Sequence, residues 1–227
     1  MPPETDTNDS ATGRRRRLVA YTRWIEELCR EDPGARTALR SGLRRGLDDV
    51  PRMHRFVSPW LPQDRRAPDS EERAYYAVAA MIAAQSRSPL TAPESGQQDQ
   101  APSAGDAAPT MGYGTSLGLA FALAVTESPG REREMRESTA ESRLNLLTRQ
   151  SINGLHRHLP AAVGYLRDVD VPVDWPQLLA DLIAWPTHSG RISRRWLQDY
   201  YRQRTQTLRE QADQADQDKV ENPAPVT

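Results

Sequence analysis

The sequence has 227 residues, enough for one domain or two small ones, and its formal net charge of -1 hides a strong segregation of charge. The single cysteine, Cys29, excludes an internal disulfide bond and a zinc site built on cysteines. No run of 18 apolar residues is present, and no apolar stretch typical of an export signal follows the four arginines at 14–17, so we expect a cytoplasmic protein.

Arginine is the dominant cation, because Lys219 is the only lysine among 30 basic residues. Residues 33–66 carry eight arginines and three aspartates, residues 143–167 four arginines and no acid, and residues 191–209 six arginines and one aspartate. Residues 210–227 carry five acids and one lysine. Basic helices with acidic ends are compatible with nucleic-acid binding, although solvated charged helix faces would give the same composition.

Apolar residues recur with helical spacing through the first half of the chain. Helices are predicted over residues 18–31, 35–47 and 50–61, and from Asp69 onward. The Asp32-Pro33-Gly34 break separates the first two. The run from Ala74 to Ala84 is nearly all apolar, so we expect this part of the chain to be the most buried of the first half.

Residues 88–111 have no basic residue and no periodicity, which is typical of a flexible insertion. A helix is predicted after them, beginning near Thr115 and Ser116, and the charged residues 127–137 follow as a hinge. The remaining chain predicts helices from a capping box at Ser138, from Pro160, from a cap at Asp174 to Trp185, and over 190–209.

The predicted fold class is all-α, since no β-strand pattern of useful length appears. The expected organisation is two small helical bundles joined by the charged hinge, with a disordered central insertion and disordered termini. Its segments are a leader at 1–13, an N-terminal bundle at 14–126 with the insertion at 88–111, the hinge at 127–137, a C-terminal bundle at 138–209 and an acidic tail at 210–227.

No pattern of catalytic residues stands out: the chain has neither a phosphate-binding loop nor a nucleophile elbow. His156 and His158 are a weak metal pattern, because residues two apart on a helix point about 200° apart. Trp175, Trp185 and Trp196 could stack on bases, but their leucine and isoleucine neighbours favour core packing. The prediction is therefore no catalytic residue, no metal site and no cofactor.

Arg36, Arg40 and Arg44 recur every four residues beside a leucine stripe. On one continuous helix they would lie within about 80° of one another and form a charged ridge. Such a ridge would neutralise phosphates without reading bases, because phosphate contacts carry no sequence information.

Several motifs follow one another in order across most of residues 20–202. They are Leu39-Arg40-x-x-Leu43-Arg44-Arg45; Pro51-Arg52-x-x-x-Phe56-Val57-x-Pro59; Glu71-x-x-Ala74-Tyr75-Tyr76; Gly114-Thr115-Ser116-Leu117-Gly118; Arg143-Leu144-x-x-Leu147; Val173-Asp174-Trp175-x-x-Leu178-Leu179; and Arg195-Trp196-x-x-Asp199-Tyr200-Tyr201. In this order and spacing the chain resembles CasB, the small subunit of the type I-E CRISPR surveillance complex Cascade.

The resemblance implies an all-helical, non-catalytic antiviral-defence protein that acts beside a second copy of itself and the other Cascade subunits. It would contact the CRISPR RNA and both strands of the target DNA, stabilising the guide–target hybrid and the displaced strand of the R-loop without reading sequence. The resemblance places the family's basic positions at Arg40 or a close neighbour, Arg143, Arg149 and Arg191, with Arg194 beside the last. The alternative is a helical DNA-binding transcription regulator, which would need a helix-turn-helix that does not stand out here.

Overall fold

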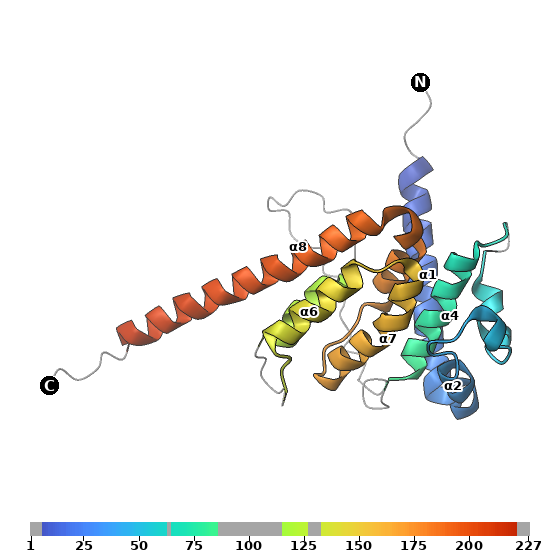
Figure 1. Ribbon diagram of the computed structural model, residues 1–227, viewed down its shortest axis with the longest axis horizontal. Helices are drawn as coiled ribbons and strands as arrows, with labels where there is room; N and C mark the ends of the chain where they lie inside the picture. Colours follow the sequence, from blue (N-terminus) through green and yellow to red (C-terminus); the bar gives the residue numbers. More distant parts are fainter. Residues whose placement is uncertain (1–5, 63–64, 86–114, 127–132, 222–227) are drawn as a thin grey trace, which may run out of the picture. The chain divides into compact units, whose positions relative to one another are not determined.

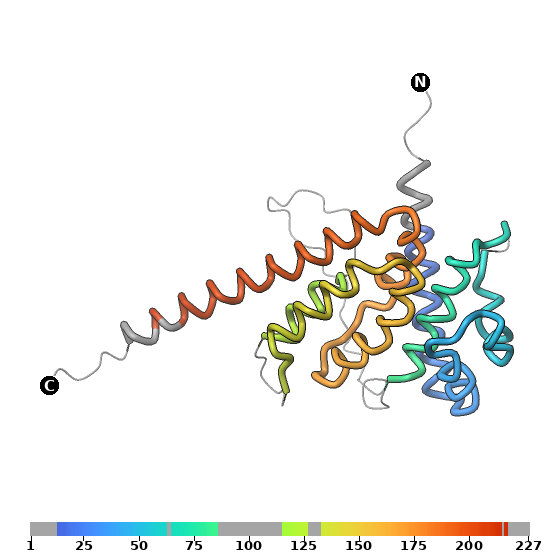
Figure 2. Tube along the Cα trace, in the orientation of Figure 1, coloured from blue at the N-terminus to red at the C-terminus, as the bar shows by residue number. Residues whose placement is uncertain are grey.

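The computed structural model describes residues 6–62, 65–85, 115–126 and 133–221. Within these ranges all regular structure is helical and no strand occurs (Figures 1 and 2). The predicted all-α fold is therefore confirmed. The predicted insertion at 88–111 and most of the predicted hinge, 127–132, lie outside the described residues.

The described helices, labelled in Figure 1 where there is room, follow the chain in a simple order. They are α1 (Asp6–Glu31), α2 (Pro33–Arg40), the short 3-10 helix η1 (Leu47–Asp49), α3 (His54–Val57), the 3-10 helix η2 (Ser58–Trp60), α4 (Asp69–Ala83), α5 (Leu117–Val125), α6 (Glu137–Thr148), α7 (Ile152–Asp168) and α8 (Trp175–Glu221).

Contacts between residues divide the chain into two compact units, and each is described by itself below. Unit 1 consists of residues 1–114 and 174–186, and unit 2 of residues 115–173 and 187–227. The predicted bundles differ from these units in two segments. Helix α5 belongs to unit 2 because it packs against α6 and α7, and the first turns of α8 belong to unit 1, where Gln177 accepts a hydrogen bond from Arg15.

An aromatic cluster lies between α1 and α4 in the core of unit 1. The ring of Tyr21 is fully buried and meets Trp60 and Tyr75 edge-on, at centroid distances of 5.6 and 4.9 Å. Its hydroxyl donates a hydrogen bond of 2.9 Å to the carbonyl of Tyr75, which satisfies the polar end of a buried ring. The expectation that the stretch from Ala74 onward is deeply buried is confirmed, since its side chains form much of this core.

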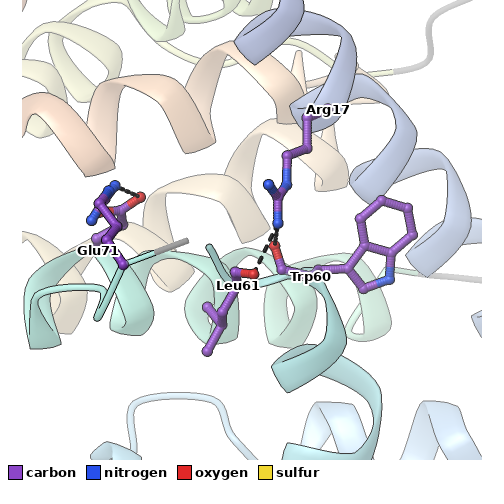
Figure 3. Close-up of polar contacts among 5 residues, drawn as sticks. Arg17, Trp60, Leu61 and Glu71 are labelled. Atoms are coloured by element: carbon purple, nitrogen blue, oxygen red, sulfur yellow. Dashed lines mark hydrogen bonds and ion pairs between the residues drawn. The ribbon is translucent and has the colours of Figure 1, made fainter. Parts of the chain in front are cut away.

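Two arginines fasten the segment that leads into α4 (Figure 3). Nη2 of Arg17 donates to the carbonyl oxygens of Trp60 and Leu61, at 2.9 and 2.8 Å. Arg65 pairs with Glu71, and 2.7 Å separates its Nη2 from Oε2 of a carboxylate whose side chain is only 11% exposed. Neither guanidinium is therefore available to a ligand without loss of an internal contact.

Helix α2 is shorter than predicted, because it ends at Arg40 and not near Leu47. The chain turns at Ser41 and Gly42, and a Cβ at Gly42 would lie 2.2 Å from Sδ of Met53. Glycine therefore leaves room for the buried Met53 side chain against the turn, and a larger residue would require that side chain to move. This contact joins segments eleven residues apart, so helical periodicity alone did not reveal it.

Several predicted caps are confirmed and one is wrong. Ser116 caps α5 by accepting from the backbone N–H of Leu119, and Asp174 caps α8 by accepting from that of Gln177. The capping box at Ser138 is not formed: α6 begins one residue earlier, and its N-cap makes no side-chain hydrogen bond. Pro160 does not start a helix, since α7 begins at Ile152 and continues through it.

Both terminal helices extend into segments predicted as disordered leader and tail. Helix α1 begins at Asp6, and α8 continues to Glu221. Between residues 191 and 221 there is no glycine or proline, so nothing in the backbone stops the helix there. Its one irregular point is His188 (φ -131°, ψ 21°), next to Pro186.

Burial of Cys29 raises the pKa of its thiol from an ordinary value of 9.0 to about 11, mainly through desolvation. We expect 5,5′-dithiobis(2-nitrobenzoate) at pH 8 to label the native protein far more slowly than the unfolded protein, because the thiolate is the reacting form. The unfolded thiol ionises first, so this residue's contribution to the free energy of unfolding should fall as the pH rises from about 9 to about 11. Rapid labelling of native protein would contradict the buried position.

Candidate nucleic-acid interface

The three arginines of the predicted ridge do not share one helix face, and this expectation is wrong. Arg36 lies on α2, but its guanidinium turns inward to the end of α4. Its Nε donates to the carbonyl of Ala83 at 3.1 Å, and its Nη2 donates to the carbonyl of Gln85. The carbonyl of Ala83 belongs to the last turn of α4, where backbone acceptors lack helical partners, and that of Gln85 follows the helix. Arg40 ends α2, and Arg44 lies beyond it in a turn.

Arg40 and Arg44 nevertheless belong to a basic surface of unit 1. Both are exposed, and within the described residues neither side chain makes a hydrogen bond or ion pair. Because Gly42 rests on Met53, the turn after α2 lies against the segment entering α3. Five exposed arginines lie in the sequence on either side of these two residues, and we call them the unit 1 basic surface: Arg40, Arg44, Arg45, Arg52 and Arg55.

Three features describe the unit 1 basic surface. Asp48 and Asp49 are the acids between residues 40 and 55, so the segment keeps a net charge of +3. Arg44 has a φ of 63°, a left-handed conformation that costs energy in a residue with a Cβ. The guanidinium of Arg55 lies 4.4 Å from the ring centroid of Phe56, which orients it without neutralising its charge.

Arg143 and Arg149 both come from α6 in unit 2 but differ in surroundings. Arg143 is half-buried and stacks on Tyr165, with 3.3 Å between its Cζ and the ring centroid. Its Nε is buried and has no hydrogen-bond partner among the described residues. Arg149 follows the last residue of α6 and is exposed. Arg143 is therefore held in place by an aromatic ring, whereas Arg149 is free to reorient.

Arg191 and Arg194 are exposed on the part of α8 that belongs to unit 2. Further along the same helix, Arg204 pairs with Glu137 of α6, with 3.2 Å between Nη2 and Oε2. Tyr201 also reaches α6, since its hydroxyl donates to Glu141 at 2.5 Å. Figure 1 shows the two helices running side by side. This face of α8 thus holds the helix on unit 2, and Arg191 and Arg194 are left outside the pairing.

Comparison with known families shows to which family the chain belongs. The sequence profile of the family described as CRISPR-associated protein Cse2 matches residues 35–201. The chain belongs to the Cse2 family. The match covers both units and includes all seven predicted site residues. No match was found among curated proteins.

Solved structures support the same family. This Cse2-family chain is 33% identical to a chain of a CRISPR RNA-guided surveillance complex, with a TM-score of 0.69 over 88% of this chain and 99% of that one. CasB from M. ruber is 25% identical, with a TM-score of 0.58 over 88% and 97%. CasB from Thermus thermophilus shares the fold at 21% identity, with a TM-score of 0.55 over 81% and 97%.

Analysis of the sequence missed three arginines of the unit 1 basic surface, namely Arg45, Arg52 and Arg55. All three were counted among the eight arginines of residues 33–66, but helical periodicity and the family resemblance were used to choose the site residues. It also missed Arg202 and Arg209, exposed residues of α8 that follow the end of the family match. Periodicity directed attention to Arg36 instead, a residue whose guanidinium caps a helix.

The remaining candidates from the sequence were three tryptophans that could stack on bases and a possible metal site. Trp175, Trp185 and Trp196 are at most 5% exposed, which confirms core packing over base stacking. Among the described residues, no group of histidine, cysteine and acidic side chains could hold a metal ion. None of the described helices combines the length and apolarity that a membrane crossing requires.

Proposed function

We propose that this chain is a non-catalytic small subunit of a type I-E RNA-guided surveillance complex in the cytoplasm. It binds nucleic-acid backbone without sequence preference and stabilises the guide RNA–target DNA hybrid and the displaced strand. Its partners are the other subunits, a second copy of itself, the CRISPR RNA and both strands of the target DNA. The 33% identity to a chain of such a complex supports the assembly.

The observation that carries the nucleic-acid part of this proposal is the unit 1 basic surface. Its arginines come from the end of α2, the turn after it and the segment that enters and forms α3, and their charge is not cancelled by ion pairs with described residues. A guanidinium binds phosphate oxygens through two parallel hydrogen bonds. In an RNA-guided complex base pairing reads the sequence, so a subunit that contributes backbone contacts alone is sufficient.

The predicted site of Arg40, Arg44, Arg143, Arg149, Arg191 and Arg194 is proposed with the addition of Arg45, Arg52 and Arg55. Arg36 is left out because its guanidinium already serves α4. We do not propose the alternative of a transcription regulator. Membership of the Cse2 family favours a subunit of a surveillance complex.

The test removes three charges from the unit 1 basic surface. We expect Arg40→Ala, Arg52→Ala and Arg55→Ala together to weaken R-loop formation by the assembled complex at least tenfold. Each lost phosphate contact should also reduce the slope of log affinity against log salt by about 0.9. R-loop formation can be followed by electrophoretic mobility shift over a series of salt concentrations.

The matched control removes three exposed arginines from unit 2 that lie outside the site, Arg133, Arg136 and Arg157. It loses the same charge and should keep the wild-type salt slope. Equal effects of the two triple variants would show that net charge matters and that the surface does not. Unchanged R-loop formation in the first variant would overturn the assignment.

A further inference from the structure

A row of exposed side chains follows α8 through unit 2, and internal packing does not explain it. Tyr201 and Leu208 are 46% and 54% exposed, although both are large and largely apolar. Exposed arginines lie beside them, and Tyr201 lines an open hollow together with Arg194, Arg202 and Arg209; Leu208 lies outside the hollow. We call this row the α8 strip; it consists of Arg194, Leu197, Tyr201, Arg202, Leu208 and Arg209.

Helix geometry places the members of the α8 strip on one side. Arg194, Tyr201 and Leu208 are seven residues apart, so each step rotates them by only about 20° and advances about 10.5 Å. Arg202 and Arg209 form a second row about 100° around the helix from the first. The arginines of the strip therefore extend over about 22 Å of a rigid rod.

The charge of the α8 strip has one sign. Between residues 190 and 209 the only acid is Asp199, which lies about 160° around the helix from Tyr201 and about 60° from Arg202; Glu210 and Asp213 follow the strip. From the neighbouring helix α6, Glu137 is paired with Arg204, and Glu141 accepts the Tyr201 hydroxyl. Arg194, Arg202 and Arg209 make no ion pair with any described residue. The strip is thus suited to an anionic partner.

The hydrogen bond from the Tyr201 hydroxyl to Glu141 also affects how the ring could bind a ligand. Because Glu141 holds the phenol end at 2.5 Å, the ring is fixed in orientation while nearly half of its surface stays open. A fixed ring loses little conformational entropy when a flat group stacks on it. The combination of a fixed aromatic ring and flanking arginines suits an unpaired base joined to phosphates.

We propose that the α8 strip is a binding site for single-stranded nucleic acid, with Tyr201 stacking on an unpaired base and the arginines neutralising phosphates. This inference rests on the proposed function; it extends the site proposed at Arg194 along α8 and names the strand type that this part takes. Duplex bases are already stacked on each other, so the exposed ring favours a single strand. Arg202, Leu208 and Arg209 follow the residues matched by the family profile.

An acidic helix of a partner protein is less well matched to the α8 strip. A helix docking in a groove needs apolar anchors at successive turns. Here Gln198 and Thr205 occupy the turns on either side of Tyr201 along the exposed face, which interrupts the apolar stripe. Charge attracts either partner, but the lone exposed ring favours a base.

The experiment measures fluorescence anisotropy of the full-length protein with two labelled probes: a twelve-residue oligodeoxythymidine and a blunt DNA duplex of equal phosphate number. Tyr201→Leu should weaken binding of the single strand about 5- to 100-fold. It should leave duplex binding within twofold. Tyr201→Phe keeps the ring and should retain most of the affinity. Arg202→Gln with Arg209→Gln should weaken binding and lower the single-strand salt slope by about 1.4.

The controls separate this inference from the proposed function. Arg133→Gln with Arg136→Gln removes two charges outside the α8 strip and should leave the single-strand salt slope unchanged. Wild-type affinity in Tyr201→Leu and in the strip double variant would overturn the inference while the proposed function stands. If the wild-type protein bound neither probe and the unit 1 variants left R-loop formation unchanged, both the inference and the proposed function would fail. Loss of assembly with partner subunits at unchanged single-strand affinity would assign the strip to protein docking.

Discussion

Replacing Gly118 with alanine should destabilise unit 2 more than the same substitution at its other described glycines. A Cβ at this position would lie 1.8 Å from the carbonyl oxygen of Trp196 and 2.5 Å from its carbonyl carbon. These are backbone atoms of α8, so no side-chain rotation relieves the clash, and α5 has to move away. Overpacking typically costs 1–3 kcal/mol, and we expect about 3 kcal/mol or more here. Urea unfolding followed by circular dichroism measures it.

Gly164 provides the matched control for this substitution. It also lies in a helix of unit 2, α7, and the nearest atom to a Cβ there is Nη2 of Arg167 at an ordinary 3.9 Å. Gly164→Ala should stabilise the protein by about 0.5–1 kcal/mol, because alanine loses less backbone entropy in a helix. Equal destabilisation by both substitutions would mean that general helix repacking, not the contact with Trp196, sets the cost at Gly118.

The contact at Gly118 shows where sequence analysis of the fold succeeded and where it stopped. Apolar periodicity and breakers such as Asp32-Pro33 predicted an all-helical chain and located most helices. Local caps at Ser116 and Asp174 were also readable, because they depend on neighbouring residues. The early end of α2 was not, since it depends on Gly42 meeting Met53. Contacts between distant segments leave no periodic pattern to detect.

The same limit applies to the candidate site. Arg36 and Arg40 are the same residue type four positions apart, and periodicity treats them alike. Their roles diverge because the end of α4 presents carbonyl oxygens near one of them and solvent surrounds the other. Sequence therefore predicted that arginines are abundant on these helices, but only the packing of α2 against α4 separates a structural arginine from one available to phosphate.

A paired substitution tests that separation directly. Arg36→Met should cost about 1.5–3 kcal/mol of unfolding free energy, because methionine keeps the aliphatic stem but loses the charge-assisted hydrogen bonds to Ala83 and Gln85. Arg40→Met removes an exposed charge and should change stability by less than about 0.5 kcal/mol. Urea unfolding of both variants under the same conditions gives the comparison.

Binding should change in the opposite order. At a temperature where both variants are folded, Arg40→Met should lower the slope of log affinity against log salt in R-loop formation by about 0.9, and Arg36→Met should leave it unchanged. This crossed pattern cannot arise from net charge, since both variants lose one arginine. If Arg36→Met reduced the slope without loss of stability, its guanidinium would be serving a phosphate and not the end of α4, and the continuous ridge expected from the sequence would regain its support.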